Sequence, residues 1–450
     1  MTKYFGTDGI RGLANLQPMT VETAVQLGKA IVATMPKQTP VFKALIGKDP
    51  RRSGYMFESA IAAGVNAMGG DVLFTGPMPT PALAHLATTM RCDAGVVISA
   101  SHNPYHDNGI KIFDANGFKL NDKHEKKIEN LLNNRDKIDA LLDPHNIGRS
   151  RRIDDALGRY LTFLKMIFPR KLSLDGLKIV VDCANGAAYK VAPILFWELG
   201  AEIIPTGVQP DGYNINKGVG ALHPEHCAQL VKEHNADLGI TLDGDADRLI
   251  LVDENANIVD GDYIMAILAT NLAKTARLPE NTLVTTVMSN LGLLKCLQKH
   301  QIKHITTQVG DRYVVDKMRE LNLGLGGEQS GHIVITEHST TGDGLIAALE
   351  VLSIMQQKKT TLSNLANIMQ KMPQILINFP VPAKPPLDSL PLTSEIIRKI
   401  ERKLGDNGRV LVRYSGTEPK CRVMLEGTNP QQLKNDAEAI AAVIKSEIPS

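Results

Sequence analysis

Short apolar runs that alternate with amphipathic helical patterns constrain the fold of this chain more than any other feature. The runs have the length of strands, and segments between them, such as residues 54–68 and 185–199, show helical spacing of their apolar residues. The runs occupy residues 44–48, 71–75, 94–98, 178–182, 202–206, 238–242, 249–252, 282–287 and 304–307. Apolar strands separated by helices are typical of βαβ units, so we predict an α/β architecture.

A faint internal repeat suggests how these units are grouped. Residues 67–77, 198–208 and 299–309 each combine a helix end, a short strand and a turn. Their strands begin about 100 to 130 residues apart, which is the spacing of domains rather than of solenoid repeats. We therefore predict three similar α/β domains with mixed sheets, arranged in tandem.

Two stretches predict where domains end. Residues 121–155 are highly charged, which indicates a solvated helix and a linker, and residues 373–391 contain six prolines. That proline density excludes a helix or a central strand. A small α+β unit is expected after it. The predicted domains cover residues 1–150, 151–258, 259–372 and 373–450.

The composition narrows the class of protein. Apolar residues make up 43% and charged residues 22%, as in soluble globular proteins. The formal net charge is only +2, so no strong field draws the chain to nucleic acid or to an anionic membrane. Aromatic residues make up 4%, which argues against base-stacking platforms. We expect neither a nucleic-acid nor a membrane partner.

The cysteines and the N-terminus indicate where the protein works. The five cysteines are widely spaced and form no C-x-x-C pair, which argues against a disulfide framework or a structural zinc site. Residues 1–12 lack the apolar core of a signal peptide, and no run of about 18 apolar residues occurs. We expect a cytoplasmic protein.

The first candidate site is the segment S-A-S-H-N-P at residues 99–104, directly after the predicted strand 94–98. Ligands of open α/β sheets bind beyond the carboxyl ends of strands, where the Ser101 hydroxyl could act as a nucleophile. A Ser/Asn-Pro turn whose hydroxyl caps a backbone group is the competing interpretation, and the spacing alone favours it.

The second candidate site is a group of three carboxylates between two predicted strands, Asp243, Asp245 and Asp247. Like charges held this close are unfavourable unless one is protonated or a cation joins them. An EF-hand is disfavoured, because Arg248 stands where its loop requires glycine and the flanking elements are strands. A magnesium site completed by a phosphate oxygen fits better than a solvated acidic turn.

The third candidate site is G-E-Q-S-G-H at residues 327–332. In an extended chain Glu328, Ser330 and His332 point to the same side, where they could recognise sugar hydroxyls. A glycine-rich turn with a satisfied histidine is equally compatible with the pattern.

The fourth candidate site combines two arginines, Arg413 and Arg422, with a loop of small residues, Ser415, Gly416 and Thr417. Backbone N–H groups around a glycine can form an anion nest, and the two guanidiniums complete a phosphate clamp. A hairpin turn is compatible with this role.

Weaker signals are glycine- and arginine-containing loops at residues 6–12 and 47–53, and a lysine, Lys111. Lys111 begins a predicted strand, and a lysine at a strand edge is usually solvated. The chain has neither a Walker phosphate loop nor a complete dinucleotide fingerprint.

Taken together and in this order, the motifs resemble those of the α-D-phosphohexomutase family. They are G-T-D-G-I-R-G at 6–12, S-x-S-H-N-P at 99–104, D-G-D-A-D-R at 243–248, G-E-Q-S-G-H at 327–332 and R-x-S-G-T-E-P at 413–419, and they span the chain. The first motif, Gln329 and S-G-T-E-P are most similar to members that act on glucosamine phosphates. Members acting on mannose and glucose phosphates usually carry Met at the position of Gln329.

The resemblance implies four domains around a central cleft, the first three alike. The domains would carry a phosphoserine loop (1–150), a metal-binding loop (151–258), a sugar-binding loop (259–372) and a C-terminal phosphate-binding loop (373–450). The chain departs from the family at Tyr414, where Pro is common, and at Asp311-Arg312, where phosphomannomutases tend to place His. No acid/base role is assigned to Asp311.

The resemblance also implies a role for each motif residue. Ser101 would be the phosphoserine, and Lys111 and His332 candidates for general acid/base catalysis. The metal ligands would be Asp243, Asp245, Asp247 and a phosphate oxygen on Ser101. The phosphoserine would be held by Arg11, His102 and Arg248. The sugar would be contacted by Glu328, Ser330 and His332, and its other phosphate by Arg413, Ser415, Gly416, Thr417 and Arg422.

The implied activity interconverts glucosamine 6-phosphate and glucosamine 1-phosphate through a phosphoserine and a 1,6-bisphosphate intermediate, on a route to UDP-N-acetylglucosamine. Its cofactors would be one Mg²⁺ per subunit and a hexose 1,6-bisphosphate activator, and its partner a small sugar phosphate. A homodimer is possible.

Three other functions stay open at this point. The chain could be a mutase for glucose or mannose phosphates, since only the loop at 327–332 distinguishes these substrates. It could also be a phosphatase that shares the metal loop, or a binder of metal or sugar phosphate without catalytic activity.

Overall fold

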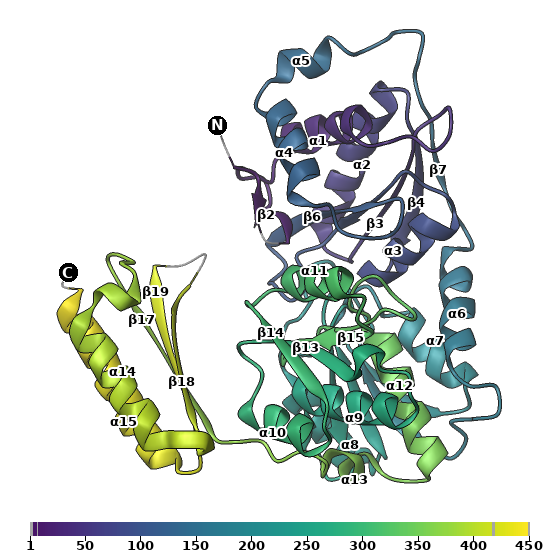
Figure 1. The fold of residues 1–450 in the computed structure, drawn as a ribbon. Coiled ribbons are helices and arrows are strands. Elements are labelled where there is room, and N and C mark those ends of the chain that lie inside the picture. The colour runs from purple at the N-terminus through teal and green to yellow at the C-terminus, as the bar shows by residue number, and fades with distance from the viewer. Residues whose placement is uncertain (1–2, 7, 416–418, 449–450) are drawn as a thin grey trace. The chain divides into compact units, whose positions relative to one another are not determined.

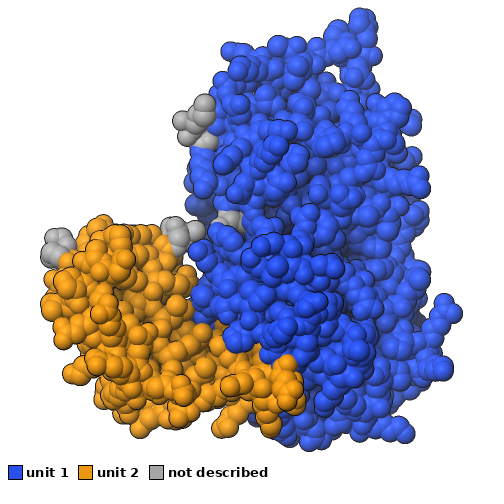
Figure 2. All heavy atoms as spheres, viewed as in Figure 1, with its two compact units in different colours: residues 1–288, 302–368 blue, residues 289–301, 369–450 orange. Residues whose placement is uncertain are grey.

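The computed structural model of the protein describes residues 3–6, 8–415 and 419–448. The chain forms two compact units, shown in Figure 2. The first comprises residues 1–288 and 302–368, and the second comprises residues 289–301 and 369–450. Within the described residues, the strands form four sheets, of which the first three belong to the first unit and the fourth to the second (Figure 1).

The first sheet has the strand order β1-β2-β6-β5-β3-β4-β7. Its strands are β1 (Phe5–Gly6), β2 (Gly9–Leu13), β3 (Lys43–Lys48), β4 (Asp71–Pro77), β5 (Ala94–Ile98), β6 (Asp107–Asp114) and β7 (Ser150–Arg152). The accompanying helices are α1 (Val21–Thr34), α2 (Arg52–Ala67), α3 (Thr80–Thr89), α4 (Asp122–Leu132) and α5 (Arg135–Asp139). Apolar faces of α1, α2 and α4 bury one core with β3 and β5, including Ile31, Ile61, Ile128 and Ile46.

The second sheet has the order β12-β11-β10-β8-β9. Its strands are β8 (Lys178–Asp182), β9 (Glu202–Thr206), β10 (Leu238–Leu242), β11 (Leu249–Asp253) and β12 (Ile258–Val259), and its helices are α6 (Ala156–Ile167), α7 (Val191–Glu198) and α8 (Pro224–His234). The central strands β8 and β10 have consecutive buried residues, most of them apolar, such as Ile179, Val180 and Val181, as parallel strands covered by helices require.

The third sheet has the order β14-β13-β15-β16. Its strands are β13 (Thr282–Thr286), β14 (Lys303–Thr307), β15 (Leu325–Gly327) and β16 (Ile333–Ile335), accompanied in sequence by α9 (Gly261–Lys274), α10 (Leu291–Lys299), α11 (Asp311–Leu321), α12 (Gly344–Lys358) and α13 (Leu362–Ala366). Helix α10 belongs to the second compact unit. Asp260 and Asp343 begin α9 and α12 as N-caps, each accepting two backbone N–H groups.

The fourth sheet is antiparallel, with the order β17-β19-β18. Its strands are β17 (Gln374–Pro380), β18 (Arg409–Tyr414) and β19 (Lys420–Glu426), and its helices are α14 (Pro391–Leu404) and α15 (Pro430–Glu447). The two helices lie along one face of the sheet (Figure 1), where Ile400 and Ile440 pack on Val423 and Leu425. The predicted small α+β unit is confirmed.

The first three sheets share one topology. The orders β4-β3-β5-β6, β9-β8-β10-β11 and β14-β13-β15-β16 each contain three parallel strands followed by one antiparallel strand. The repeated segments of the sequence form the equivalent outer strands β4, β9 and β14. The prediction of three similar α/β domains with mixed sheets is confirmed. The individual domain boundaries stay predictions.

The structure corrects three local expectations. Residues 150–152, expected in a linker, form strand β7 and pair parallel with β4. The predicted helix 185–199 is shorter, because Ala184 and Asn185 adopt left-handed backbone angles and the helix begins at Val191. The proline-rich segment contains an edge strand, β17, a position that tolerates proline because one side of the strand needs no partner.

No helix among the described residues combines the length and the apolar character that crossing a membrane demands.

Candidate active site

Three candidate loops occupy the same position in the three similar sheets. Residues 99–106 (the serine loop) join β5 to β6, residues 243–248 (the metal loop) join β10 to β11, and residues 328–332 (the sugar loop) join β15 to β16. Each loop therefore connects a parallel strand to the antiparallel strand beside it. The carboxyl ends of parallel strands are where α/β sheets bind ligands, so the topology places all three loops at such ends.

The Ser101 hydroxyl lies in the interior of the first unit, with 1% of the residue exposed. Its Oγ donates to Oδ2 of Asp243 at 2.5 Å, which joins the serine loop to the metal loop across 142 residues of sequence. Its backbone N–H donates to Oγ of Ser99 at 2.9 Å. Nδ1 of His102 lies 3.2 Å from the same Oγ. The structure therefore brings the predicted nucleophile and the predicted metal ligands together.

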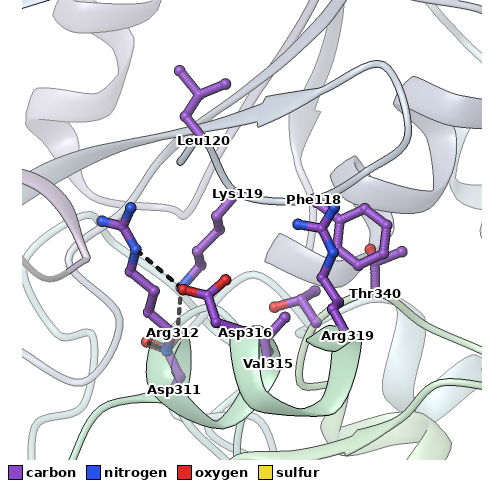
Figure 3. A pocket seen from close by; sticks show the side chains of 10 residues that line it. Phe118, Lys119, Leu120, Asp311, Arg312, Val315, Asp316, Arg319 and Thr340 are labelled. Atoms are coloured by element: carbon purple, nitrogen blue, oxygen red, sulfur yellow. Dashed lines mark hydrogen bonds and ion pairs between the residues drawn. The ribbon is translucent and has the colours of Figure 1, made fainter. Parts of the chain in front are cut away.

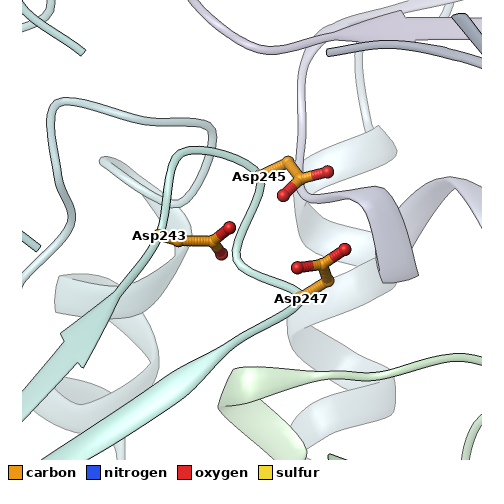
Figure 4. A group of neighbouring side chains, drawn as sticks. All are labelled: Asp243, Asp245 and Asp247. Atoms are coloured by element: carbon orange, nitrogen blue, oxygen red, sulfur yellow. The ribbon is translucent and has the colours of Figure 1, made fainter. Parts of the chain in front are cut away.

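The three carboxylates of the metal loop converge, as Figure 4 shows. Asp243, Asp245 and Asp247 are buried, and one ligand oxygen from each lies within 4.8 Å of the others. Asp245 also accepts hydrogen bonds from the Thr80 hydroxyl at 2.6 Å and from Nζ of Lys111 at 2.9 Å.

The electrostatics of this loop fit a hard divalent cation. Burial, together with the neighbouring charges of Asp247 and Asp245, raises the pKa of Asp243 well above its ordinary value. Oδ1 of Asp245 and Oδ1 of Asp247 are buried with no hydrogen-bond partner among the described residues. Carboxylate oxygens are the ligands that Mg²⁺ prefers, and a cation between them would relieve both the repulsion and the missing partners.

Lys111 differs from its sequence-based expectation. It lies in the middle of β6 rather than at a strand edge, and it is 1% exposed rather than solvated. Its Nζ lies 3.2 Å from Asp247 and 3.3 Å from Asp8, in addition to its hydrogen bond with Asp245. Burial opposes the positive charge, but these carboxylates outweigh it and raise the pKa of Lys111 well above its ordinary value. Lys111 is therefore an ammonium group in this arrangement.

A chain of alternating charges continues from Lys111 toward the sugar loop. The carboxylate of Asp8 forms ion pairs with Arg11, Lys111 and Lys119. Lys119 in turn pairs with Asp311 at the start of α11, as seen in Figure 3. Burial opposes ionisation of Asp311, yet Lys119 outweighs it and lowers the pKa of this carboxyl. The predicted contact residue Arg11 thus lies beside this network.

The sugar loop is a tight turn, which is the second of the two conformations that its sequence pattern allowed. The N–H of Glu328 donates to the carbonyl of His332 at 2.9 Å, and Gly331 adopts a left-handed φ of 91°. The turn buries Glu328 and His332 and leaves Ser330 exposed, so the three side chains do not share one environment. Neither ring nitrogen of His332 has a hydrogen-bond partner among the described residues, and Nε2 lies 3.6 Å from Oδ2 of Asp311.

Of the predicted phosphoserine contacts, His102 borders the Ser101 hydroxyl and Arg248 adjoins Asp243. Arg248 donates its backbone N–H to Asp243 at 3.2 Å and forms an isolated antiparallel bridge with His332, which links the metal and sugar loops. Burial opposes its charge, but Asp247 and Asp243 raise the pKa of the Arg248 guanidinium. Burial and then the charges of Arg248 and Arg11 lower the pKa of His102 to about 3, so its ring is neutral.

The predicted phosphate clamp lies in the second unit. Arg413 and Arg422 are directly paired across β18 and β19, and Ser415 is buried just after β18. Burial and the neighbouring charge of Arg422 lower the pKa of Arg413. Two cations held side by side favour an anion between them. Gly416 and Thr417 lie outside the described residues.

Comparisons with known proteins agree with this arrangement. Models of the phosphoglucomutase/phosphomannomutase family match its alpha/beta/alpha domains I, II and III at residues 2–139, 158–257 and 260–372, and its C-terminal domain at residues 376–443. A phosphoglucosamine mutase of Geobacter metallireducens is 54% identical over 449 residues, covering 100% of this chain and 99% of the relative. One of Geotalea uraniireducens is 53% identical with the same coverage.

The chain belongs to the phosphoglucosamine mutases, within the α-D-phosphohexomutase family. It is therefore an isomerase. Solved structures show the same fold. A phosphoglucomutase/phosphomannomutase family protein of Burkholderia thailandensis has a TM-score of 0.78 at 22% identity, covering 99% of this chain and 98% of that one. An Aspergillus fumigatus N-acetylphosphoglucosamine mutase, solved with GlcNAc-6P and magnesium, has a TM-score of 0.65 at 18% identity, covering 95% and 99%.

Several residues of this phosphohexomutase site were not predicted from the sequence. They are Asp8, Thr80, Lys119 and Asp311, which contact predicted site residues or one another by hydrogen bonds or ion pairs. Asp8 stands within the first motif, G-T-D-G-I-R-G, which could have directed attention to it. Thr80 and Lys119 stand in no recognisable motif, and only the folded arrangement reveals their partners.

Proposed function

We propose that this chain interconverts glucosamine 6-phosphate and glucosamine 1-phosphate by carrying a phosphoryl group on Ser101. One observation carries the proposal: Oγ of Ser101 lies 2.5 Å from a carboxylate of a buried acidic triad that comes from a different sheet. A serine beside a candidate cation site is suited to hold and transfer a phosphoryl group. The full-length likeness to phosphoglucosamine mutases supports this substrate.

The reaction proceeds in two transfers. In the first, the bond between phosphorus and Oγ of Ser101 breaks while a bond from phosphorus to sugar O1 forms, and O1 loses its proton to a general base. The product is glucosamine 1,6-bisphosphate. It turns end for end. In the second transfer the bond between phosphorus and sugar O6 breaks while a bond from phosphorus to Oγ of Ser101 forms. Oγ gives up its proton, O6 takes one up, and glucosamine 1-phosphate leaves. A hexose 1,6-bisphosphate phosphorylates Ser101 in the same way and so acts as activator.

Positive charge around Ser101 promotes both transfers. Asp243, Asp245 and Asp247 would hold one Mg²⁺, which supplies charge to the phosphoryl oxygens. Arg11 and Arg248 contribute guanidiniums that bind the non-bridging oxygens. Phosphoryl transfer depends mainly on positioning and on neutralising charge, so these groups account for most of the catalysis.

Acid/base catalysis and sugar recognition fall to residues near the sugar loop. Neither ring nitrogen of His332 has a hydrogen-bond partner among the described residues, so this side chain can exchange a proton with a sugar hydroxyl. Lys111 can do so once its carboxylate partners bind a cation. Such a group contributes about 10²–10⁴-fold to the rate. Glu328 and Ser330 would bind further hydroxyls of the sugar.

The second unit would bind the phosphate that is not being transferred. Arg413 and Arg422 carry the charge for this role, and Ser415 adds a hydroxyl. Gly416 and Thr417 complete the proposed clamp as carriers of backbone N–H groups and a hydroxyl.

The decisive experiment compares turnover of glucosamine 6-phosphate, mannose 1-phosphate and glucose 1-phosphate, each with Mg²⁺ and a hexose 1,6-bisphosphate. A strong preference for glucosamine 6-phosphate is expected. Intact-protein mass spectrometry should also show one phosphoryl group, located at Ser101 by peptide mapping.

Each alternative function has its own outcome in this experiment. Equal or better turnover of the other sugars would make the chain a general hexose-phosphate mutase. Release of inorganic phosphate without an isomerised sugar would indicate a phosphatase. Failure of any bisphosphate to phosphorylate Ser101 would leave only a binding function.

A further inference from the structure

A fully buried arginine lies beneath the serine loop. Arg51, at the start of α2, is 0% exposed and pairs with Asp49, which is equally buried. Nη2 of Arg51 donates to the carbonyl oxygen of Ser101 at 3.2 Å and also to the carbonyl oxygen of Asn103. Because Asp49 balances its charge and the residue is buried, Arg51 acts on the backbone of the loop.

A second donor reaches the same two carbonyls from the second sheet. Asn216 lies in the loop that follows β9, and its Nδ2 donates to Ser101 O at 2.9 Å and to Asn103 O at 3.1 Å. Asn216 is itself held, because its backbone N–H donates to the carbonyl of Ala184 at 2.8 Å. Arg51 and Asn216 therefore hold the serine loop by hydrogen bonds, each from a segment that follows a strand of a different sheet.

Ser101, whose carbonyl oxygen accepts both hydrogen bonds, has an unusual backbone conformation. Ser101 adopts a φ of 51°, in the left-handed region that residues other than glycine rarely occupy. A carbonyl oxygen has two lone pairs, and at Ser101 two donors fill them. Conformations of this kind persist where the surrounding structure over-determines them. The neighbouring metal loop is equally tight, since a Cβ on Gly244 would come within 2.5 Å of the Ser101 carbonyl.

We infer that Arg51 and Asn216 are positioning residues that fix the direction in which Ser101 presents its Oγ to the metal loop and to the substrate. The inference rests on the proposed function. Within the described residues, neither the Arg51 nor the Asn216 side chain forms a hydrogen bond with Oγ of Ser101. Phosphoryl transfer requires near in-line geometry, and a displacement of about 1 Å can reduce the rate about 10²-fold.

The test uses Asn216, because removing Arg51 would leave Asp49 buried without its partner. Asn216→Ala should lower kcat about 10- to 10²-fold, with KM for glucosamine 6-phosphate changed less than about threefold. Asn216→Asp keeps the size of the side chain but replaces the donor with a carboxylate that faces two carbonyl oxygens. It should therefore lower kcat further than Asn216→Ala.

The matched control is Asn214→Ala. Asn214 lies two residues away in the same loop, and its amide donates to Gln209 O within that loop at 2.9 Å. This variant should keep wild-type kcat. If Asn214→Ala lowered kcat as much as Asn216→Ala, the effect would belong to the loop as a whole and the inference would be wrong.

A spectroscopic measurement separates positioning from folding. Each protein is phosphorylated with a hexose 1,6-bisphosphate, and the phosphoserine resonance is recorded by ³¹P NMR. The resonance should shift in Asn216→Ala and Arg51→Lys, and it should stay unchanged in Asn214→Ala. A folded Asn216→Ala protein with wild-type kcat and a wild-type resonance would overturn the inference. A wild-type protein that is phosphorylated but does not isomerise glucosamine phosphates would instead overturn the proposed function.

Discussion

The serine loop differs from the metal and sugar loops in how its polar side chains are satisfied, although all three loops occupy the same place in their sheets. In the serine loop, Oγ of Ser101 already donates to Asp243, which lies 142 residues away in sequence. In the metal loop, Oδ1 of Asp245 and Oδ1 of Asp247 are buried without a hydrogen-bond partner among the described residues. In the sugar loop, His332 is buried with both ring nitrogens unpartnered among the described residues. An unsatisfied buried polar group costs about 1–3 kcal/mol, so its presence indicates a ligand.

The same loop position in three similar sheets can therefore serve two purposes, to hold a reacting group in place or to bind a ligand. Where chemistry occurs, the protein fixes its groups in advance, because transfer depends on geometry. Where a cation or the substrate binds, it leaves polar atoms for that ligand to complete. The following variants test this division.

Ser101→Ala should break the serine loop's function entirely. Without the hydroxyl no phosphoryl group can be carried, and kcat should fall about 10⁴-fold or more. The measurement is mutase turnover together with intact mass after treatment with a bisphosphate. Ser59→Ala is the control, because Ser59 is an exposed residue of α2 whose hydroxyl donates to the carbonyl oxygen of Tyr55 within the same helix. Full mutase activity in Ser101→Ala would refute the proposed mechanism.

Lys111→Met should have the next largest effect. It removes the ammonium that lies against Asp245, Asp247 and Asp8, so kcat should fall about 10²–10³-fold. Lys119→Met is the matched comparison, because that lysine bridges Asp8 and Asp311 rather than the metal loop. Its loss in kcat should be smaller. Equal losses would mean that total charge, rather than charge at the metal loop, controls the rate.

Asp343→Asn tests a buried carboxylate that is satisfied without a cation. Asp343 accepts the Tyr160 hydroxyl at 2.6 Å and caps α12, and burial raises its pKa to about 6. Because the folded state favours the protonated form, its contribution to stability is complete below about pH 4 and is lost as pH rises to about 6. The loss amounts to ~3 kcal/mol.

Denaturant unfolding at pH 4 and pH 7 measures this effect. Between pH 4 and pH 7, the free energy of unfolding of the wild type should fall relative to that of Asp343→Asn. Above pH 7, the difference between the two proteins should stay constant. Tyr160→Phe removes the hydroxyl that stabilises the Asp343 carboxylate. Its free energy of unfolding should therefore fall more between pH 4 and pH 7 than that of the wild type. Identical pH dependence of wild type and Asp343→Asn would show that Asp343 does not titrate in this range.

His332→Ala sharpens the contrast within the sugar loop. Losing a hydrogen bond between the substrate and a buried ring should lower kcat/KM about 10- to 10²-fold. Ser330→Ala should cost less, because Ser330 is exposed on the same turn. Phosphorylation of Ser101 should remain possible in both variants. The comparison fails if Ser330→Ala costs more than His332→Ala.

The sequence alone was sufficient for the α/β class, the threefold repeat and the metal triad. These features are encoded locally, in apolar runs of strand length and in three carboxylates within five residues. Such a pattern can be recognised in the sequence because the strands that carry it are buried regardless of which segments pack against them. The resemblance to the phosphohexomutases, which rested on such short motifs, was confirmed for the same reason.

Only the tertiary structure decided the environment of each side chain. Lys111 is buried with Asp8, Asp245 and Asp247 around it, and all three lie more than a hundred residues away in sequence. Glu328 and His332 face each other across a turn because Gly331 takes a left-handed conformation. Asn216 reaches the serine loop from another sheet. Charge balance and hydrogen-bond partners are set by distance in space, and spacing along the chain does not contain that distance.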